Sequence, residues 1–152
     1  MKKIFLIIVL FTFSLLRAED VSGTISTDTI WQGLINVVGD ITLLNAHLTI
    51  QSGTVVTFMG DFQINAEGLI TAEGTETDSI FFVADNQQWD SIKLDYNPAN
   101  GEFHSFRNCR FRDADIAIKI LNSPAEIRQC SFAFMGNMAI DVFGLNNNNP
   151  PD

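Results

Sequence analysis

The chain is poor in basic residues. It contains 9 Lys and Arg against 18 Asp and Glu among its 152 residues, which gives a formal net charge of −9. Three of the basic residues, Lys2, Lys3 and Arg17, lie within the first 18 residues, which contain no acidic residue, so the remainder carries a net charge of −12. A surface that acidic repels phosphate groups. The composition therefore predicts no nucleic-acid partner and no anionic membrane partner.

Cysteine and long apolar runs are also scarce. Two cysteines in the whole chain exclude a disulfide scaffold, and their spacing fits no zinc site. After residue 18 no stretch approaches the roughly 20 apolar residues that a membrane-spanning helix requires, so we expect no transmembrane segment in the mature chain. His47 and His104 stand alone, outside any metal-binding histidine motif. We expect no cofactor, and calcium in oxygen-rich loops is the one metal to consider.

The first 18 residues have the layout of a bacterial-type secretory signal peptide. Lys2 and Lys3 give a positive start, an apolar run covers residues 4–16, and Ala18 is a small residue before the acidic Glu19. The apolar run holds only about 13 residues, too few to span a membrane. We expect cleavage between Ala18 and Glu19 and an exported chain that is secreted, periplasmic or at the cell surface.

The rest of the chain repeats at an interval of 21 residues. Residues 39–43 resemble residues 60–64, and residues 106–111 resemble residues 127–132, with Cys on Cys and Phe on Phe. Repetition at this period is the signature of a solenoid. The period predicts that these pairs stack on one another: Ile41 with Phe62, Leu48 with Leu69, Cys109 with Cys130 and Phe111 with Phe132, and, at an offset of 24, Val56 with Ile80.

Each period contains short strands separated by corner residues. Apolar and polar residues alternate, for example over residues 41–43, 48–50 and 56–58, and no helical periodicity extends over ten residues. Gly and Asn, such as Asn45 and Asn108, fall between these stretches, where tight bends need left-handed backbone. This is the pattern of a parallel β-helix of about five coils. The alternative is a β-sandwich, whose strands would not recur at a constant interval.

Several segments of the sequence resemble a known family of repeat proteins. Residues 38–43, 48–58, 69–75 and 80–82, followed by the Asn-Cys-Arg-Phe and Gln-Cys-Ser-Phe sequences at 108–111 and 129–132, resemble the N-terminal portion of exported bacterial right-handed parallel β-helix repeat proteins of the pectin-lyase-like superfamily. The resemblance implies an all-β, right-handed parallel β-helix. That superfamily includes polysaccharide lyases and hydrolases, but also adhesins and surface proteins, so the resemblance specifies the fold more closely than the activity.

These observations divide the chain into four parts. We expect a signal peptide over residues 1–18, an N-terminal cap or lead-in over 19–30, the parallel β-helix over 31–145 and a disordered tail over 146–152. The polar tail is too short to close the last coil, which contains Ile127, Cys130, Phe132, Ile140 and Val142. A solenoid end left open in this way favours self-association through the C-terminal coil.

One charged cluster is the best local candidate for carbohydrate chemistry. Asp113 and Asp115 can share a face as paired carboxylates, and Arg110 and Arg112 can bind an acidic sugar. The alternative, which we favour, is a solvated corner with weak surface ion pairs. The reason is that the corresponding positions of the next coil supply no further carboxylates: Ser131, Ala133, Phe134 and Gly136.

Trp89 marks a second candidate. Asp85, Asp90 and Asp95 surround it, so that an exposed indole would stack on a sugar ring beside oxygen ligands for calcium. The favoured alternative is that Trp89, like Trp31, packs into the core at the start of a coil. The stacked Cys109 and Cys130 lie within disulfide range, but we expect a reduced, buried pair.

The sequence therefore favours an exported, non-catalytic β-helix module. It would bind a polysaccharide or a cell-surface partner, as an adhesion module or as a fragment of a larger surface protein. The first alternative is a carbohydrate-active enzyme, either a lyase or a glycoside hydrolase. A second alternative is an ice- or surface-templating solenoid, which needs a threonine array that Thr42, Thr49, Thr57 and Thr71 do not form at the 21-residue period.

Overall fold

The computed structural model describes residues 17–96, 98 and 100–143, and within them every regular element is a β-strand. The predicted signal sequence up to residue 16 and the predicted disordered tail over residues 146–152 lie outside this part of the chain. The strands are β1 (Glu19–Ile25), β2 (Thr29–Trp31), β3 (Leu34–Ile50), β4 (Val55–Phe58), β5 (Ile64–Glu73), β6 (Ile80–Ala84), β7 (Ile92–Leu94), β8 (His104–Arg107), β9 (Cys109–Arg112), β10 (Ile116–Leu121), β11 (Ala125–Arg128), β12 (Ser131–Ala133) and β13 (Met138–Phe143).

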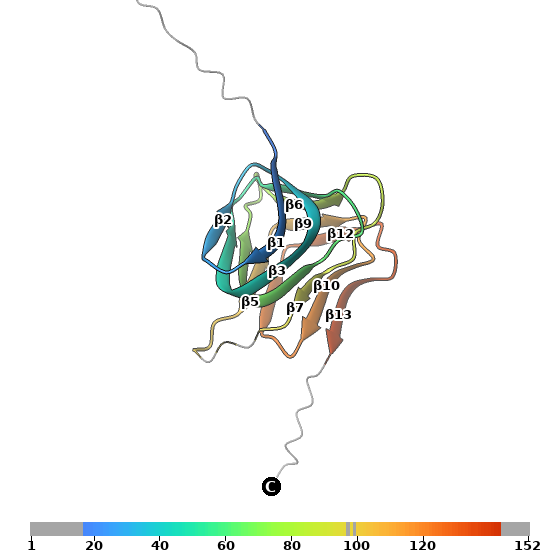
Figure 1. Cartoon of the computed structure of the whole chain (residues 1–152). Helices are drawn as coiled ribbons and strands as arrows, with labels where there is room; N and C mark the ends of the chain where they lie inside the picture. Colours follow the sequence, from blue (N-terminus) through green and yellow to red (C-terminus); the bar gives the residue numbers. More distant parts are fainter. Residues whose placement is uncertain (1–16, 97, 99, 144–152) are drawn as a thin grey trace, which may run out of the picture.

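The strands pair only in parallel and wind into a β-solenoid of about five turns (Figure 1). Each turn contributes to three faces. Face 1 contains the first part of β3 and then β4, β6, β9 and β12. Face 2 contains the middle of β3, the first part of β5 and then β7, β10 and β13. Face 3 contains β2, the ends of β3 and β5, and then β8 and β11. The expected parallel β-helix is confirmed as a β-solenoid.

The 21-residue register is confirmed between β3 and β4, where Leu34 pairs with Val55, and again in the last turns on faces 1 and 3. Phe111 pairs with Phe132, and Arg110 pairs with Ser131, which places the preceding residues, Cys109 and Cys130, at equivalent positions of neighbouring turns. The pairings predicted for Ile41 and Leu48 are wrong, because β4 and β5 are joined by a longer corner than the one inside β3. The observed partners are Ile64 for Ile41 and Ile70 for Leu48, and a similar shift places Phe82 rather than Ile80 beside Val56.

The interior is filled by ladders of apolar side chains, most visibly on face 1. Phe82, Phe111 and Phe132 come from three successive turns and stack nearly parallel, with ring centroids 4.8 and 5.0 Å apart. The first two are fully buried, and Phe132 is half-buried. Parallel strands in register lie about 4.8 Å apart, so the ring spacing follows directly from the strand spacing. Stacking of successive turns therefore buries the apolar alternation that the sequence displays.

The corners between faces use left-handed backbone, as predicted for Asn45 and Asn108, which have φ angles of 49° and 48°. Four further non-glycine residues do the same: Asp113, Asn122, Gln129 and Phe134. Asn108 and Gln129 precede β9 and β12, and Asp113 and Phe134 follow them, so left-handed residues recur at matching corners of neighbouring turns. These corners allow each strand to end abruptly while the next begins in register.

The two ends of the solenoid differ. Residues 19–30, expected as a cap or lead-in, contribute β1 and most of β2, and both strands pair in parallel with β3 as a first turn. At the other end, the apolar residues expected to be uncovered are indeed less buried than the core. Ile140 and Val142 are 36% and 51% exposed, and Ile127 and Phe132 are half-buried. Within the described residues, nothing packs over this last, incomplete turn.

Candidate functional site

Trp89 is buried, so the proposal that it stacks on a sugar ring is wrong. Its side chain has no exposed surface, and its indole lies on the Phe58 ring with centroids 4.2 Å apart and planes inclined by 5°. The indole N–H donates to the backbone carbonyl of Arg112 at 2.9 Å. Burial of an indole requires a partner for its N–H, and this contact supplies it. The alternative reading, in which Trp89 packs into the core as Trp31 does, is confirmed.

Burial of Trp89 fixes the loop between β6 and β7. Its backbone N–H donates to the Asp113 carbonyl at 3.2 Å, and its carbonyl accepts from the Asp115 N–H at 2.7 Å. Trp89 thus pairs with Ala114 of the following turn as an isolated parallel bridge. The loop residues before Trp89 are exposed, from Asp85 to Gln88. A rigid base therefore holds a projecting polar loop at the corner between faces 1 and 2.

Two adjoining shallow cavities flank this loop and share Gln87 and Gln88. The first, of about 350 Å³, is lined by Asp61, Gln87, Gln88, Asp90 and Asp115. The second, of about 320 Å³, is lined by Ala84, Asp85, Asn86, Gln87, Gln88 and Asp113. We call the residues of both cavities the polar corner. Its amide and carboxylate side chains are donors and acceptors suited to hydroxyl-rich ligands.

The polar corner combines carboxylates from three successive turns. Asp61 lies between β4 and β5, Asp90 between β6 and β7, and Asp115 between β9 and β10. The expectation concerned the following turn, whereas the two turns before Asp115 are the ones that add Asp61 and Asp90 to its cavity. The Asp90 carboxylate also forms an ion pair with the Lys119 ammonium group, with Oδ1 and Nζ 2.8 Å apart. In the described part of the chain, no three acidic, histidine or cysteine side chains converge as a metal-ligand set.

The predicted charged cluster is divided rather than assembled. Asp113 and Asp115 line different cavities of the polar corner. Arg110 and Arg112 point outward from β9, where their guanidinium groups lie over the Phe81 and Phe134 rings, at 5.8 and 5.1 Å from the centroids. The two arginines therefore pack on aromatic rings, of which Phe81 is half-buried and Phe134 exposed, and Arg110 lines a separate cavity beside Cys130.

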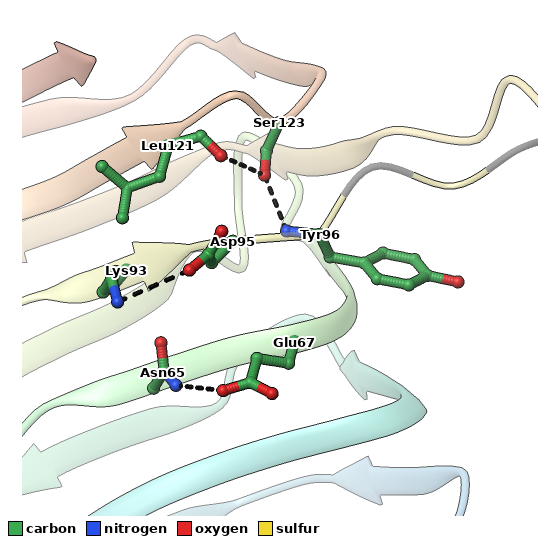
Figure 2. Close-up of polar contacts among 7 residues, drawn as sticks. All are labelled: Asn65, Glu67, Lys93, Asp95, Tyr96, Leu121 and Ser123. Carbon is green, nitrogen blue, oxygen red and sulfur yellow. Dashed lines mark hydrogen bonds and ion pairs between the residues drawn. The ribbon is translucent and has the colours of Figure 1, made fainter. Parts of the chain in front are cut away.

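Asp95, the third acidic residue near Trp89, lies elsewhere, at the end of face 2. Figure 2 shows it paired with Lys93, at 3.6 Å, above a similar pair in which the Asn65 amide donates to Glu67 at 2.8 Å. Lys93 and Asn65 are themselves register partners on β7 and β5. Each contact joins residues two apart in the sequence, so the pairs form an outward-facing row at the surface of face 2.

His104 is the one strongly perturbed histidine. It is fully buried, and its Nδ1 accepts from the Ile70 backbone N–H at 3.2 Å. Its Nε2 finds no partner with hydrogen-bond geometry among the described residues. Burial lowers the pKa of His104 to about 4, against a smaller raising effect from the Tyr96 backbone. A neutral imidazole in the wall of face 3 is a structural group, distant in the fold from the polar corner.

The sequence-based prediction missed five residues of the polar corner: Asp61, Ala84, Asn86, Gln87 and Gln88. Asp61 was not predicted because the 21-residue period aligns it with Asp40. The structure instead places it beside the residues of the longer corners that follow, Asp90 and Asp115. Gln87 and Gln88 lie in the same insertion of the repeat as Trp89, and this insertion was the sequence feature that could have indicated them.

The observed register also changes which residues stack on the threonines that were considered for a surface-templating array. Thr49 pairs with Thr71, but Thr42 pairs with Asn65 and Thr57 with Val83, so no threonine array forms on any of the three faces.

Comparison of the chain with protein-family models, with curated proteins and with solved structures finds no match. In the described residues no helix is long and apolar enough to cross a membrane.

Proposed function

We propose that this chain is an exported, non-catalytic right-handed β-helix module that binds a polysaccharide at the polar corner. The resemblance to pectin-lyase-like repeat proteins and the layout of residues 1–18 support the family and the export. The polar corner supports the ligand class. In a larger cell-surface protein, the same corner would serve adhesion to a surface glycan.

The observation that carries this proposal is the pair of adjoining cavities that share Gln87 and Gln88. Both side chains are exposed on a loop whose base is fixed by the buried Trp89. Amides present both donors and acceptors, which matches the hydroxyl groups of a sugar. Since the base is rigid, ligand binding would order only the exposed side chains, which limits the entropy lost on binding.

Calorimetric titration of the mature chain with neutral oligosaccharides of xylose, mannose and glucose tests the proposal. We expect measurable binding to at least one, weakened about tenfold in a Gln87→Ala, Gln88→Ala double variant, because a tenfold change corresponds to loss of about one hydrogen bond. Gln51→Ala, which removes an exposed amide at another corner, is the matched control. Equal affinity of the double variant and the wild type would contradict the assignment of the site.

One observation favours a carbohydrate-active enzyme as the alternative. Asp61, Asp90 and Asp115 line one cavity from three successive turns, and paired carboxylates are what glycoside hydrolysis needs. Asp90 forms an ion pair with Lys119, so this carboxylate already has a partner. Incubation of the protein with the oligosaccharide that it binds distinguishes the two functions. Release of reducing ends that Asp115→Asn abolishes would establish the enzyme. An oligosaccharide that stays intact would support the non-catalytic binding module.

A further inference from the structure

The two cysteines form a matched pair on neighbouring turns of face 1. Each follows a left-handed residue, Asn108 or Gln129. Each sulfur also lies 3.3 Å from the carbonyl oxygen two residues earlier and 3.4 Å from a carbonyl of the preceding turn. Equivalent residues on parallel neighbours have Cα atoms about 4.8 Å apart, which is within the range that a disulfide bridges. Both thiols are free in the structure.

The two thiols differ in access. Cys109 is fully buried beneath the last turn. Cys130 is half-buried and lines a cavity of about 280 Å³ together with Glu76, Ser79, Asn108, Arg110, Gln129 and Ser131. A small solute can therefore reach Cys130 through this cavity, whereas Cys109 does not line it.

The two thiols also differ in acidity. A hydrogen bond from the Cys109 thiol lowers the pKa of Cys130 to about 7, although burial acts in the opposite direction. The same contact, together with burial, raises the pKa of Cys109. A thiolate is the nucleophilic form of cysteine. Cys130, the more accessible cysteine, is thus the one that is reactive near neutral pH, whereas the buried Cys109 keeps its thiol proton.

We propose that Cys130 and Cys109 form an oxidation-responsive pair, in which Cys130 reacts with a hydroperoxide and Cys109 then closes a disulfide. In the first step the Cys130 sulfur attacks a peroxide oxygen, the O–O bond breaks and hydroxide leaves, taking up a proton to become water. Cys130 is now a sulfenic acid. In the second step the Cys109 sulfur attacks the Cys130 sulfur, the S–O bond breaks, and a second water leaves with the Cys109 proton. Two thiols are oxidised and one hydrogen peroxide is reduced to two waters.

The position of the Cys109–Cys130 disulfide would give the oxidation a structural effect. Cys109 begins β9 and Cys130 precedes β12, so the disulfide would tie the incomplete last turn to the turn before it. That last turn has half-buried Phe132 and exposed Val142, and no further turn covers it among the described residues. Oxidation would therefore fasten one end of the solenoid, where few buried contacts oppose local unfolding.

The test treats the mature chain with an equimolar amount of hydrogen peroxide and measures intact mass. We expect a loss of about 2 Da, the mass of two hydrogen atoms, and a Cys109–Cys130 peptide in the non-reducing digest. In Cys109→Ala the reaction should stop at the sulfenic acid, which dimedone then labels at Cys130. In Cys130→Ala native Cys109 should react with iodoacetamide at least about tenfold more slowly than Cys130 does in Cys109→Ala, because it is buried.

Three results would overturn the proposal: oxidation of the wild type that stops at a sulfenic or sulfinic acid, a disulfide that joins two chains on a non-reducing gel, or equal alkylation rates for the two cysteines. Circular dichroism of both alanine variants checks that they are folded. Should Cys109→Ala fail to fold, Cys109→Ser, which keeps a hydroxyl in place of the thiol, provides the same dimedone readout.

Discussion

The indole of Trp89 lies flat on the Phe58 ring, with ring centroids 4.2 Å apart, although the two residues belong to successive turns of the solenoid. The stack joins the loop that carries the polar corner to the core beneath it. Because the Trp89 N–H also binds the Arg112 carbonyl, one side chain connects three turns. Trp89 is therefore the residue on which both stability and the shape of the polar corner depend.

Replacement of Trp89 tests this relationship. Trp89→Ala should lower the free energy of unfolding by about 3–5 kcal/mol, as is usual when a large buried aromatic is truncated, and should weaken oligosaccharide binding as well. Trp89→Phe keeps an aromatic ring for the stack and loses the N–H contact and part of the indole volume, so it should cost less than Trp89→Ala, about 1–2 kcal/mol. Urea denaturation followed by circular dichroism gives both values. Equal losses for the two variants would argue against the stack.

The phenylalanine ladder predicts unequal costs along face 1. Phe111→Ala should cost about 3–5 kcal/mol, because Phe111 is fully buried between Phe82 and Phe132. Phe132→Ala should cost clearly less, because Phe132 is half-buried and has a ring on one side only. Phe103→Ala, at a residue 46% exposed, should stay within about 0.5 kcal/mol. Urea midpoints of the three variants rank these costs, and a Phe132 value equal to that of Phe111 would show that the last turn is covered in solution.

His104 predicts a loss of stability in mild acid. In the unfolded chain its imidazole binds a proton below about pH 6.5, whereas in the folded chain it stays neutral until about pH 4. Its contribution is therefore intact above pH 6.5 and is lost as the pH falls from 6.5 to 4, by an amount on the order of 3 kcal/mol. Protonation of Nδ1 would also break the bond from the Ile70 N–H.

The comparison that isolates this effect is His104→Gln, whose side chain keeps an acceptor but does not titrate. Carboxylates titrate in the same pH range in both proteins, so the difference between the two stability profiles belongs to His104. We expect the wild type to lose more stability than the variant between pH 6.5 and 4, measured by urea denaturation. Parallel stability profiles would mean that the His104 imidazole binds a proton equally well in the folded and the unfolded chain.

The uncovered last turn predicts self-association. Val142 pairs with Ile120 on an inward position of face 2 but remains 51% exposed. Light scattering of the mature chain should therefore show an average mass that rises with concentration, and Val142→Asp should reduce this rise. Val38→Asp, at an exposed valine in the second turn, is the control. A concentration-independent monomer with slow amide exchange over residues 127–143 would contradict the prediction.

The proposed export predicts a defined N-terminus. Mass spectrometry of the protein recovered from outside the cytoplasm should give a chain that begins at or near Glu19. Strand β1 begins at that residue and pairs Glu19 with Ile35, so cleavage after Ala18 leaves the first turn whole. A soluble exported protein that retains Met1 would rule out cleavage.

The sequence was sufficient for the fold class because alternation and repetition are read directly from side chains. Phe111 and Phe132 stand 21 residues apart, and they stack as this period predicts. The pairings of Ile41 and Leu48 were missed because register is set by inward packing and hydrogen bonding between strands, not by residue count. A corner with two additional residues leaves the strands in place while it shifts every later number.

The polar corner was harder to predict for the same reason. Asp61, Asp90 and Asp115 meet because three corners of different length lie at one edge of the solenoid. No constant period brings them together in the sequence. Trp89 was easier to interpret, since an aromatic residue at the start of a coil has few places to lie other than the core.

The unequal turns have a consequence for how this molecule can change. Ile41 and Ile64 are 23 residues apart and Ile64 and Ile92 are 28 apart, yet all three stack on face 2. The additional residues lie between strands, so exterior shape and interior packing vary independently. An insertion between Gln87 and Gln88 would remodel the polar corner and leave the hydrophobic interior intact. One residue inserted inside β6 would instead turn its inward side chains to solvent. New specificities would therefore arise in this solenoid through changes in corner length, at little cost to folding.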